Sequence, residues 1–392
     1  KLKGNQSMQT SAIITGITGQ DGSYLAEYLL ERDIQVYGGI RKTSSSPSDL
    51  ARIQHLLHHP NLFLEHLDLL DPLSIAKFVS FVDNNTHMYR KQGFNPIQVY
   101  NLAAQSHVGD SFRIPTVTHQ INAVAVLILL DRLHAHFGEN DGFRFYQAST
   151  SELYGNLKGT GEVVEMDEDT PFNPASPYAV AKAAAFQTVK NYRETYNIHA
   201  VNGILFNHES PRRGIDFVTR KITRGVADYA LGKIDTPIEL GNVNAKRDWG
   251  DAREYIEAMY VMLNEAEGKT IQDYVVASGT THSVRKFVTA AFKVIGIQVK
   301  WKGKGLDEVA VDIKTNNTLV KINKDFHRPL DVQALLGNPK KIKENLRWQP
   351  KTTFEELVED MVNSDIALLQ KNGREWHYEK KCKTNRIDHV HS

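Results

Sequence analysis

A short apolar run followed by three evenly spaced glycines constrains the fold of this chain more than any other feature. Residues 11–15 (SAIIT) have the pattern of a buried strand, residues 16–22 are GITGQDG, and residues 23–30 have the spacing of an amphipathic helix. Glycines at such a junction let a strand turn sharply into a helix and let other groups approach the backbone closely. The order strand, glycine-rich turn, helix therefore predicts a parallel α/β fold with a ligand at the positive end of the helix.

Apolar strand patterns and helical patterns alternate through the first half of the chain. The expected strands are residues 11–15, 34–40, 62–67, 97–102, 143–148 and 199–205, and the longest helical patterns are 115–137 and 177–196. Alternation of this kind predicts a doubly wound parallel sheet, the Rossmann arrangement, with ligand at the carboxyl ends of the strands. The pattern becomes irregular after about residue 206. We therefore expect a smaller, mixed C-terminal lobe that binds the substrate.

This change of pattern sets the expected organisation of the chain. Residues 8–206 would form mainly the dinucleotide-binding domain and residues 207–371 mainly the substrate lobe, with segments free to interleave. Residues 1–7, which precede Met8, are expected to be a remnant of expression. The charged, histidine-containing residues 372–392 are expected to be a mobile tail.

The stretch after the second expected strand indicates which dinucleotide would bind. Enzymes that use NAD usually place Asp or Glu about twenty residues past the glycines, where it binds the ribose 2′-hydroxyl. Here Arg41 and Lys42 occupy that stretch, and no acid does. Cations favour a 2′-phosphate, so we expect NADP. A solvated basic loop is the alternative, and it would not explain the missing acid.

A tyrosine and a lysine four residues apart form the second chemical signal. Pro177 suits the first turn of a helix, so Tyr178 and Lys182 would share one face near its start. A phenol has a reference pKa of about 10 and is a poor base at neutral pH. A lysine cation about 6 Å away would favour the phenolate by roughly 2–3 kcal/mol at an effective dielectric of about 20. The pair could then accept a proton from an alcohol that is being oxidised. Taken alone the pair also fits an ordinary surface contact.

Composition narrows the class of protein. The 392 residues are 41% apolar, and 47 Lys and Arg against 46 Asp and Glu give a net charge of +1. This balance gives no reason to expect nucleic acid or an anionic membrane as a partner, and no apolar stretch approaches a membrane span. The single cysteine, Cys382, excludes an internal disulfide and favours a cytoplasmic protein. The sixteen histidines lack metal-ligand spacing, so we expect no metal.

Several longer motifs indicate a family. They are YNLAAQSHV at 100–108, STSELYG at 149–155, LFNHESPRRG at 205–214, VTRKI at 218–222, AKRDWG at 245–250 and RPLDV at 328–332. On these motifs the chain resembles the extended short-chain dehydrogenases and, within them, the GDP-mannose 4,6-dehydratases. The resemblance runs from about residue 11 to residue 371 and includes the glycine turn.

The resemblance implies a reaction and roles for four residues. GDP-mannose would be oxidised at C4, lose water across C5 and C6, and regain the hydride at C6, giving GDP-4-keto-6-deoxy-mannose without net use of NADP. Tyr178 would take the proton of the 4-hydroxyl, Lys182 would also hold the nicotinamide ribose, and Thr150 would hydrogen-bond the C4 oxygen. Glu152 would take the C5 proton. A 4-epimerase needs no such base, so Glu152 favours a dehydratase; the alternative for Glu152 is a structural ion pair.

The resemblance also implies two sets of binding residues. Cofactor contacts are expected from Gly16, Gly19, Gln20, Asp21, Gly22, Arg41, Lys42, Asp68, Leu69, Leu102, Ala103, Ala104, Ser106, Tyr178, Lys182, His208 and Arg213. Substrate contacts are expected from Ser106, Glu152, Asn207, Lys221, Arg247, Arg328 and Asp331. Planar guanidinium groups suit a diphosphate, although Arg247 could instead pair with Asp248 or Glu254.

One departure and several alternatives remain. Asp331 stands where the family usually has Glu, which shortens its reach toward a ribose diol. The alternative functions are dehydration or 4-epimerisation of another nucleotide sugar, a dehydratase that also reduces its own product, and a non-catalytic NADP-binding scaffold. Residues 44–46 and Arg52 resemble the family segment that builds a tetramer, so we expect a homodimer or homotetramer.

Overall fold

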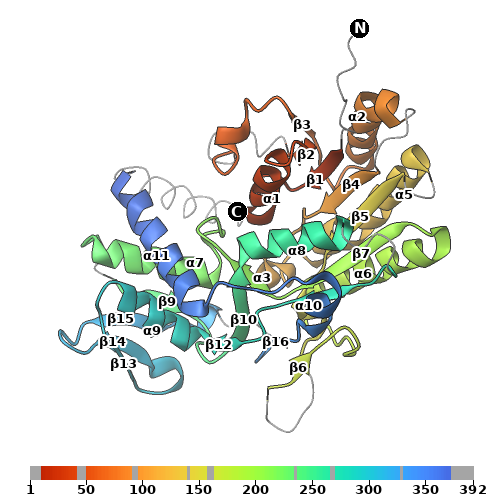
Figure 1. Ribbon diagram of the computed structural model, residues 1–392. Helices are drawn as coiled ribbons and strands as arrows, with labels where there is room; N and C mark the ends of the chain where they lie inside the picture. The colour runs from red at the N-terminus through yellow and green to blue at the C-terminus, as the bar shows by residue number, and fades with distance from the viewer. Residues whose placement is uncertain are drawn as a thin grey trace, which may run out of the picture. The chain divides into compact units, whose positions relative to one another are not determined.

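A computed structural model describes residues 10–41, 50–90, 96–138, 142–156, 163–233, 236–264, 270–326 and 330–371. Within them the chain forms two compact units, whose elements are labelled in Figure 1. The first unit comprises the described residues of 10–212, 245–282 and 330–352. The second comprises those of 213–244, 283–326 and 353–371. The chain therefore passes between the units several times.

A seven-stranded sheet in the order β3-β2-β1-β4-β5-β7-β11 forms the centre of the first unit. Its strands are β1 (Ser11–Thr15), β2 (Gln35–Ile40), β3 (Leu62–His66), β4 (Ile97–Asn101), β5 (Phe143–Ala148), β7 (His199–Leu205) and β11 (Tyr274–Val276). All neighbouring strands are parallel. This confirms the predicted doubly wound parallel sheet. The strand order reverses between β1 and β4, and ligands of such sheets bind at that reversal.

Both faces of the sheet are covered by helices. Along β1, Ala12 and Ile14 face one apolar core and Ile13 faces the other, as the two-residue period of a strand requires. Helices α1 (Gln20–Leu30) and α8 (Ala252–Asn264) cover the first face, and α2 (Pro72–Arg90), α5 (Ala125–Phe137) and α6 (Pro177–Tyr196) cover the second (Figure 1). Burial on both faces explains why the strands are apolar without alternation.

The expected boundaries hold closely, with two exceptions. The six expected strands begin and end within one residue of those observed, and helix 177–196 is observed unchanged, whereas α1 begins three residues earlier than expected. The single helix expected over 115–137 is wrong in its middle. It divides into α4 (Pro115–His119), a π-helical turn η3 (Gln120–Val124) and α5.

The side chain of Asn122 explains this interruption. Its Oδ1 accepts from the Gln105 amide and its Nδ2 donates to the Gln105 carbonyl, both at 2.9 Å. Asn122 is buried, and a π turn inserts an extra residue that changes where such a side chain points. The helix is therefore irregular at Asn122, whose side chain binds the loop that follows β4.

Shorter elements complete the first unit. They are η2 (Gln54–Leu56), α3 (Val108–Ser111), η4 (Ser151–Leu153), β6 (Glu165–Met166), β8 (Asn207–Glu209), β10 (Lys246–Asp251), β16 (Leu336–Gly337) and α10 (Lys340–Leu346). Strands β8 and β10 are parallel and belong to a three-stranded sheet with β12 (Thr281–Ser283), while β6 pairs with β16.

The second unit has a mixed sheet of its own. Its order is β13-β14-β15-β9, with strands β13 (Val299–Lys302), β14 (Val309–Asp312), β15 (Thr318–Ile322) and β9 (Ile238–Leu240). The first two pairings are antiparallel and the last is parallel. The unit also contains α7 (Val218–Ala230), α9 (Val284–Val294), α11 (Phe354–Lys371) and the short turns η5 (Gly305–Asp307) and η6 (Lys324–Phe326). The mixed sheet agrees with the mixed C-terminal region that the sequence predicts.

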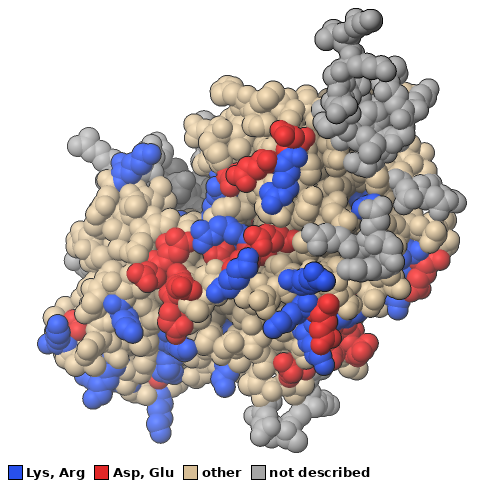
Figure 2. All heavy atoms as spheres, in the orientation of Figure 1, with Lys and Arg blue, Asp and Glu red and all other residues tan. Residues whose placement is uncertain are grey.

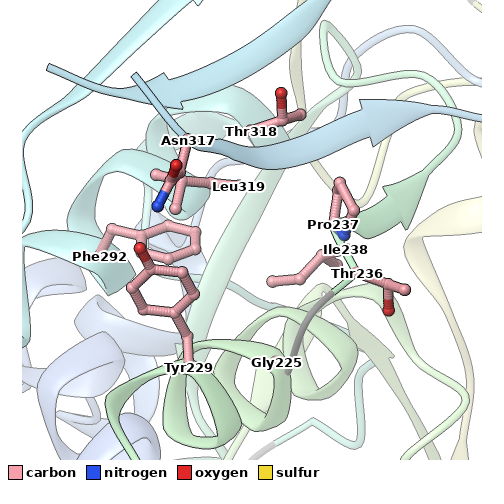
Figure 3. Close-up of a pocket in the computed structure, with 9 residues that line it drawn as sticks. All are labelled: Gly225, Tyr229, Thr236, Pro237, Ile238, Phe292, Asn317, Thr318 and Leu319. Atoms are coloured by element: carbon pink, nitrogen blue, oxygen red, sulfur yellow. The ribbon is translucent and has the colours of Figure 1, made fainter. Parts of the chain in front are cut away.

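The second unit contains a cavity of about 450 Å³. Figure 3 shows its lining, which is Gly225, Tyr229, Thr236, Pro237, Ile238, Phe292, Asn317, Thr318 and Leu319. None of these residues belongs to the expected cofactor or substrate sets.

The charged surface is mixed. On the face shown in Figure 2, acidic and basic side chains intermingle, in keeping with the net charge of +1. Among the described residues, no helix is both long and apolar enough to cross a membrane, and no group of three or more His, Cys, Asp or Glu side chains could hold a metal ion.

A buried carboxylate joins two helices of the second unit. Asp365 of α11 is fully buried, and Arg220 Nε of α7 donates to both of its oxygens at 2.9 Å. The Thr223 hydroxyl donates to it at 2.7 Å, and a nitrogen of Arg224 lies 3.7 Å away. Removing one member of such a buried pair leaves an uncompensated charge.

We expect Asp365→Asn to lower the free energy of unfolding by about 3–5 kcal/mol, because Arg220 loses its counter-ion inside the protein. Urea denaturation measures the change. The control is Glu355→Gln in the same helix, which breaks an exposed pair with Lys286 (3.4 Å) and should cost less than about 1 kcal/mol. Equal losses in the two variants would contradict the account of Asp365.

Candidate active site

The glycine-rich turn after β1 folds tightly on itself and on the loop after β4. Gly16 has a φ of +73°, and a Cβ there would lie 2.9 Å from Ala103 Cα. A Cβ on Gly22 would lie 2.3 Å from the Gly16 carbonyl oxygen. Helix α1 begins after Gly19, and no side chain caps it. An uncapped helix start approached by bare backbone fits the pyrophosphate of a dinucleotide.

The first turn of α1 is tied to β8. Asp21 Oδ2 lies 2.9 Å from His208 Nε2, and Gln20 Nε2 donates to the His208 carbonyl at 3.1 Å. The Ser210 hydroxyl donates to Gln20 Oε1 at 2.8 Å. The other ring nitrogen of His208 lies 2.8 Å from the Phe206 carbonyl. Both ring nitrogens of His208 therefore face oxygen atoms. The structure thus brings three expected cofactor residues together.

The residues expected near the adenosine end follow β2 and β3. Arg41 is exposed directly after β2, and Lys42 lies outside the described residues. The Asp68 carboxylate accepts from the Leu70 amide at 2.9 Å, which shapes the turn after β3, and Leu69 within that turn is partly buried.

The loop after β4 is held from the side of β1. The Thr15 hydroxyl donates to Asn101 Oδ1 at 2.7 Å and accepts from the amides of Leu102 (3.0 Å) and Ala103 (3.1 Å). Two consecutive amides are thereby fixed beside the glycine turn.

The same loop is held from the helical side. Asn122 binds both main-chain groups of Gln105, as described above, and Gln105 lies between two expected cofactor residues, Ala104 and Ser106. Ser106 is exposed. Residues 102–106 are therefore fixed at both ends of the loop.

Helix α6 begins as the sequence predicts. The Ser176 hydroxyl accepts from the Ala179 amide at 3.1 Å, and Pro177 occupies the first turn. Tyr178 and Lys182 follow on one face, and both are buried. Lys182 Nζ lies 5.9 Å from the centre of the Tyr178 ring. The ammonium thus lies near the aromatic ring of Tyr178.

The Lys182 ammonium binds the end of β5. Its Nζ donates to the Ala148 carbonyl at 2.8 Å, and Gln147 Nε2 donates to the same oxygen at 3.0 Å. Burial lowers the pKa of Lys182 to about 8, and the charge of Asp21 opposes that shift. Lys182 therefore remains mostly charged at neutral pH although only 4% of it is exposed.

Thr150 and Glu152 lie just beyond β5. The Thr150 hydroxyl accepts from the Glu152 amide at 3.2 Å at the start of η4, and Thr150 is buried. Glu152 is partly exposed. In the part of the chain that the structure describes, the Glu152 carboxylate has no hydrogen bond or ion pair. The ion pair considered as its alternative role is not seen there.

Three expected substrate residues of the first unit, Asn207, Arg247 and Asp331, lie in or against β8 and β10. Asn207 in β8 is partly buried and in register with Trp249. Arg247 in β10 is buried; it donates to the Val332 carbonyl at 2.8 Å and lies 3.6 Å from Asp331 Oδ1. Arg247 thus has Asp331 as an ion-pair partner.

Neither of the partners considered for Arg247 takes this role. Asp248 is buried and accepts from the Ser278 amide and hydroxyl, the Gly279 amide and the Gly337 amide. Burial raises the pKa of Asp248, and these hydrogen bonds oppose the shift. Glu254 Oε1 instead accepts from Thr352. The carboxylate of Asp248 joins three segments around β10.

The remaining expected residues are placed less completely. Arg213 and Lys221 belong to the second unit, where Arg213 lies 3.7 Å from the ring centre of Phe217 and Lys221 Nζ 3.5 Å from that of Phe326. Arg328 lies outside the described residues.

Three buried polar residues of the site are absent from the expected sets. Thr15, Asn101 and Gln147 lie at or near the ends of β1, β4 and β5, and each is at most 1% exposed. Asn101 Nδ2 donates to Gln147 Oε1 at 2.8 Å. The sequence contains a weak indication of these residues, since each of the three strands has an uncharged polar residue at or next to its carboxyl end.

Comparisons with known proteins identify a family for the chain. The family model described as GDP-mannose 4,6 dehydratase matches residues 13–361. A GDP-mannose 4,6 dehydratase of Drosophila melanogaster is 48% identical over 367 residues, covering 92% of this chain and 87% of the relative.

Two solved structures share the fold at low identity. One is a dTDP-glucose 4,6-dehydratase from Bacillus anthracis in complex with NAD (TM-score 0.69, 21% identity, covering 94% of this chain and 99% of that chain). The other is RMD from Pseudomonas aeruginosa complexed with NADPH (TM-score 0.66, 20% identity, covering 92% and 100%). At such identity these two likenesses concern the fold alone.

The family match spans most of the chain and includes the glycine turn, the segment after β5 and the tyrosine–lysine pair of α6. The chain belongs to the GDP-mannose 4,6-dehydratase family.

Proposed function

We propose that this chain is a lyase that dehydrates GDP-mannose to GDP-4-keto-6-deoxy-mannose with a bound nicotinamide cofactor, NADP. Family membership supports the substrate and the overall reaction. The observation that carries the chemistry is Glu152, a partly exposed carboxylate without a partner among the described residues, next to the end of β5 where Lys182 binds. That carboxylate is what a dehydratase needs beyond the groups of an epimerase.

Tyr178 and Lys182 would handle the proton of the 4-hydroxyl. The ammonium 5.9 Å from the tyrosine ring stabilises the phenolate, which then accepts the hydroxyl proton as C4 is oxidised. When bound, the cofactor accepts a hydride from C4 and later returns one to C6. Thr150 would donate a hydrogen bond to the C4 oxygen.

Glu152 would act once C4 is a ketone. The ketone acidifies the C5 hydrogen, and a carboxylate free of ion pairs can remove it. The hydroxyl on C6 would then leave as water, together with the proton that Glu152 has taken from C5. A hydride would return to C6 and a proton exchanged with solvent would be added at C5. Because the hydride taken from C4 is the one returned to C6, the reaction needs no external reductant.

We infer NADP rather than NAD from the stretch after β2. Arg41 is exposed there, Lys42 follows it, and the acid that would bind a ribose 2′-hydroxyl is missing from the sequence. The nucleotide sugar would contact Ser106, Asn207, Lys221, Arg247, Arg328 and Asp331. Residues 8–206 would serve mainly the cofactor and residues 207–371 mainly the nucleotide sugar.

We also propose a cytoplasmic homodimer or homotetramer without nucleic-acid or membrane partners. Of the segment that resembles the family's tetramer contact, residues 44–46 lie outside the described residues. Arg52 donates to the Thr18 carbonyl of the glycine turn at 3.2 Å. An interface there would lie beside the cofactor turn. Light scattering at micromolar concentration tests the assembly, and a monomeric mass would refute it.

Mass spectrometry of the sugar nucleotide tests the reaction. Purified protein is incubated with GDP-mannose and NADP⁺ without reductant. Loss of one water with no net NADPH is expected. An unchanged mass despite GDP-mannose binding would instead indicate another sugar, an epimerase or a scaffold. Consumption of added NADPH would reveal a dehydratase that also reduces its product.

We expect Glu152→Gln to stop solvent deuterium from entering at C5 and to lower turnover by about 100-fold or more, because the amide cannot accept the proton. NADPH binding should be unchanged. Glu165→Gln, at an exposed position of β6, is the control and should behave as the unmodified protein. Retained deuterium entry in the Glu152 variant would assign the base to another residue.

Reversing the charge of Arg41 tests the cofactor. We expect Arg41→Glu to raise the KM for NADP by about tenfold or more and to leave that for NAD nearly unchanged, because the carboxylate repels only a 2′-phosphate. Steady-state kinetics with each cofactor measures this. Lys77→Glu, an equal charge change at an exposed position of α2, should alter neither. An unchanged KM for NADP would rule out Arg41 as a phosphate contact.

Lys182→Met should abolish turnover yet stabilise the fold. With its pKa lowered from 10.5 to about 8, the buried ammonium destabilises the folded state by about 3 kcal/mol at pH 7. Losing the bond to Ala148 costs about 1 kcal/mol, so a net gain of about 2 kcal/mol is expected.

The pH dependence of stability checks the sign of this effect. Between pH 8 and pH 10.5 the unfolded chain holds the Lys182 proton more than the folded chain does, so the stability of the unmodified protein rises with pH in that window. The advantage of Lys182→Met in urea denaturation should therefore shrink from pH 7 to pH 10. A variant less stable than the unmodified protein at pH 7 would contradict this account.

A further inference from the structure

Three neighbouring strands end in a continuous row of buried polar side chains. Thr15 of β1 is in register with Asn101 of β4, and Asn101 with Gln147 of β5. Register neighbours of parallel strands point to the same face, so the three side chains can join. The Thr15 hydroxyl donates to Asn101 (2.7 Å), and the Asn101 amide donates to Gln147 (2.8 Å).

This row ends on the carbonyl that binds Lys182. Gln147 Nε2 donates to the Ala148 oxygen at 3.0 Å, and Lys182 Nζ donates to the same oxygen at 2.8 Å. The carbonyl therefore has two donors, one from its own strand and one from α6. Both ends of the Gln147 amide are used, and the residue is only 1% exposed.

We propose that Gln147 is a positioning residue for Lys182. Its amide fixes the Ala148 carbonyl, and that carbonyl sets where the ammonium lies relative to Tyr178 and the cofactor. The inference rests on the proposed function, in which Lys182 serves both. A lysine ammonium is a point charge on a flexible stem, so an acceptor held in place restricts it more than its own rotamers do.

The other end of the row explains why the positioning would matter. Thr15 also holds the amides of Leu102 and Ala103 in the loop beside the glycine turn. One row of hydrogen bonds therefore connects that loop with the ammonium of Lys182. Both are expected to contact the nicotinamide half of the cofactor, so their spacing would be set by Asn101 and Gln147.

Gln147→Met is the first test, because methionine has a similar shape and forms neither hydrogen bond. We expect kcat to fall about 10- to 100-fold and the NADPH dissociation constant, measured by fluorescence, to rise about 3- to 10-fold. The KM for GDP-mannose should stay within about threefold. In a Lys182→Met background the same change should alter NADPH binding by less than about twofold, since it acts through Lys182.

A matched control separates positioning from general damage. Thr86 of α2 is buried, and its hydroxyl donates to the Val82 carbonyl at 2.8 Å. Thr86→Val likewise removes a buried hydrogen bond to a main-chain oxygen of the first unit. It should leave kcat and NADPH binding unchanged, whatever it costs in stability.

Gln147→Glu keeps the test decisive if the methionine variant does not fold. Its carboxylate would still accept from Asn101 and would add a negative charge near the Lys182 ammonium, in addition to that of Asp21. NADPH binding should then persist to higher pH than in the unmodified protein. A purely structural Gln147 would leave that pH profile in place.

The outcomes distinguish this inference from the proposed function. If the unmodified protein binds no NADPH, both fail. If it binds NADPH and dehydrates GDP-mannose, but Gln147→Met matches it in kcat and NADPH affinity, only the positioning role fails. An equal loss of NADPH affinity with and without Lys182 would also overturn that role.

Discussion

The contact between the Lys182 ammonium and the Ala148 carbonyl organises the centre of this protein. A buried cation is unfavourable unless acceptors compensate it, and here the carboxyl end of β5 supplies one at 2.8 Å. Burial lowers the pKa of Lys182 to about 8, so the group is charged at neutral pH but held at a cost in stability. The proposed role of Lys182 beside Tyr178 would account for a charge that is kept at this cost.

The reversal of strand order explains why the other groups gather at the same place. The chain leaves β1 and β4 in opposite directions, which opens a gap at their carboxyl ends. Gly16 and Gly22 allow the first turn to close against Ala103, and Thr15 holds the loop amides across the gap. The glycine turn after β1 and the loop after β4 therefore lie together at the carboxyl edge of the sheet.

Local features of the site could be predicted from the sequence, and features that depend on contacts between distant residues could not. Ser176 and Pro177 mark the start of α6 in the sequence itself, so the placement of Tyr178 and Lys182 followed from neighbouring residues. The hydrogen bonds of Asn122 to Gln105 and of Arg247 to Val332 join positions 17 and 85 residues apart. The spacing of apolar residues along a sequence does not indicate such pairs. The π turn in the helix expected over 115–137 is a consequence of the pair between Asn122 and Gln105.

Three carboxylates of this chain differ in their surroundings, and the difference separates structural groups from a candidate base. Asp365 and Asp248 are buried, and each accepts several hydrogen bonds, so they hold elements of the fold together. Glu152 is the contrary case, because it lies just beyond the end of β5, is partly exposed, and has no hydrogen bond or ion pair through its carboxylate among the described residues. Such a carboxylate adds nothing evident to stability. Its position is therefore better explained by a role as a base than by a role in folding.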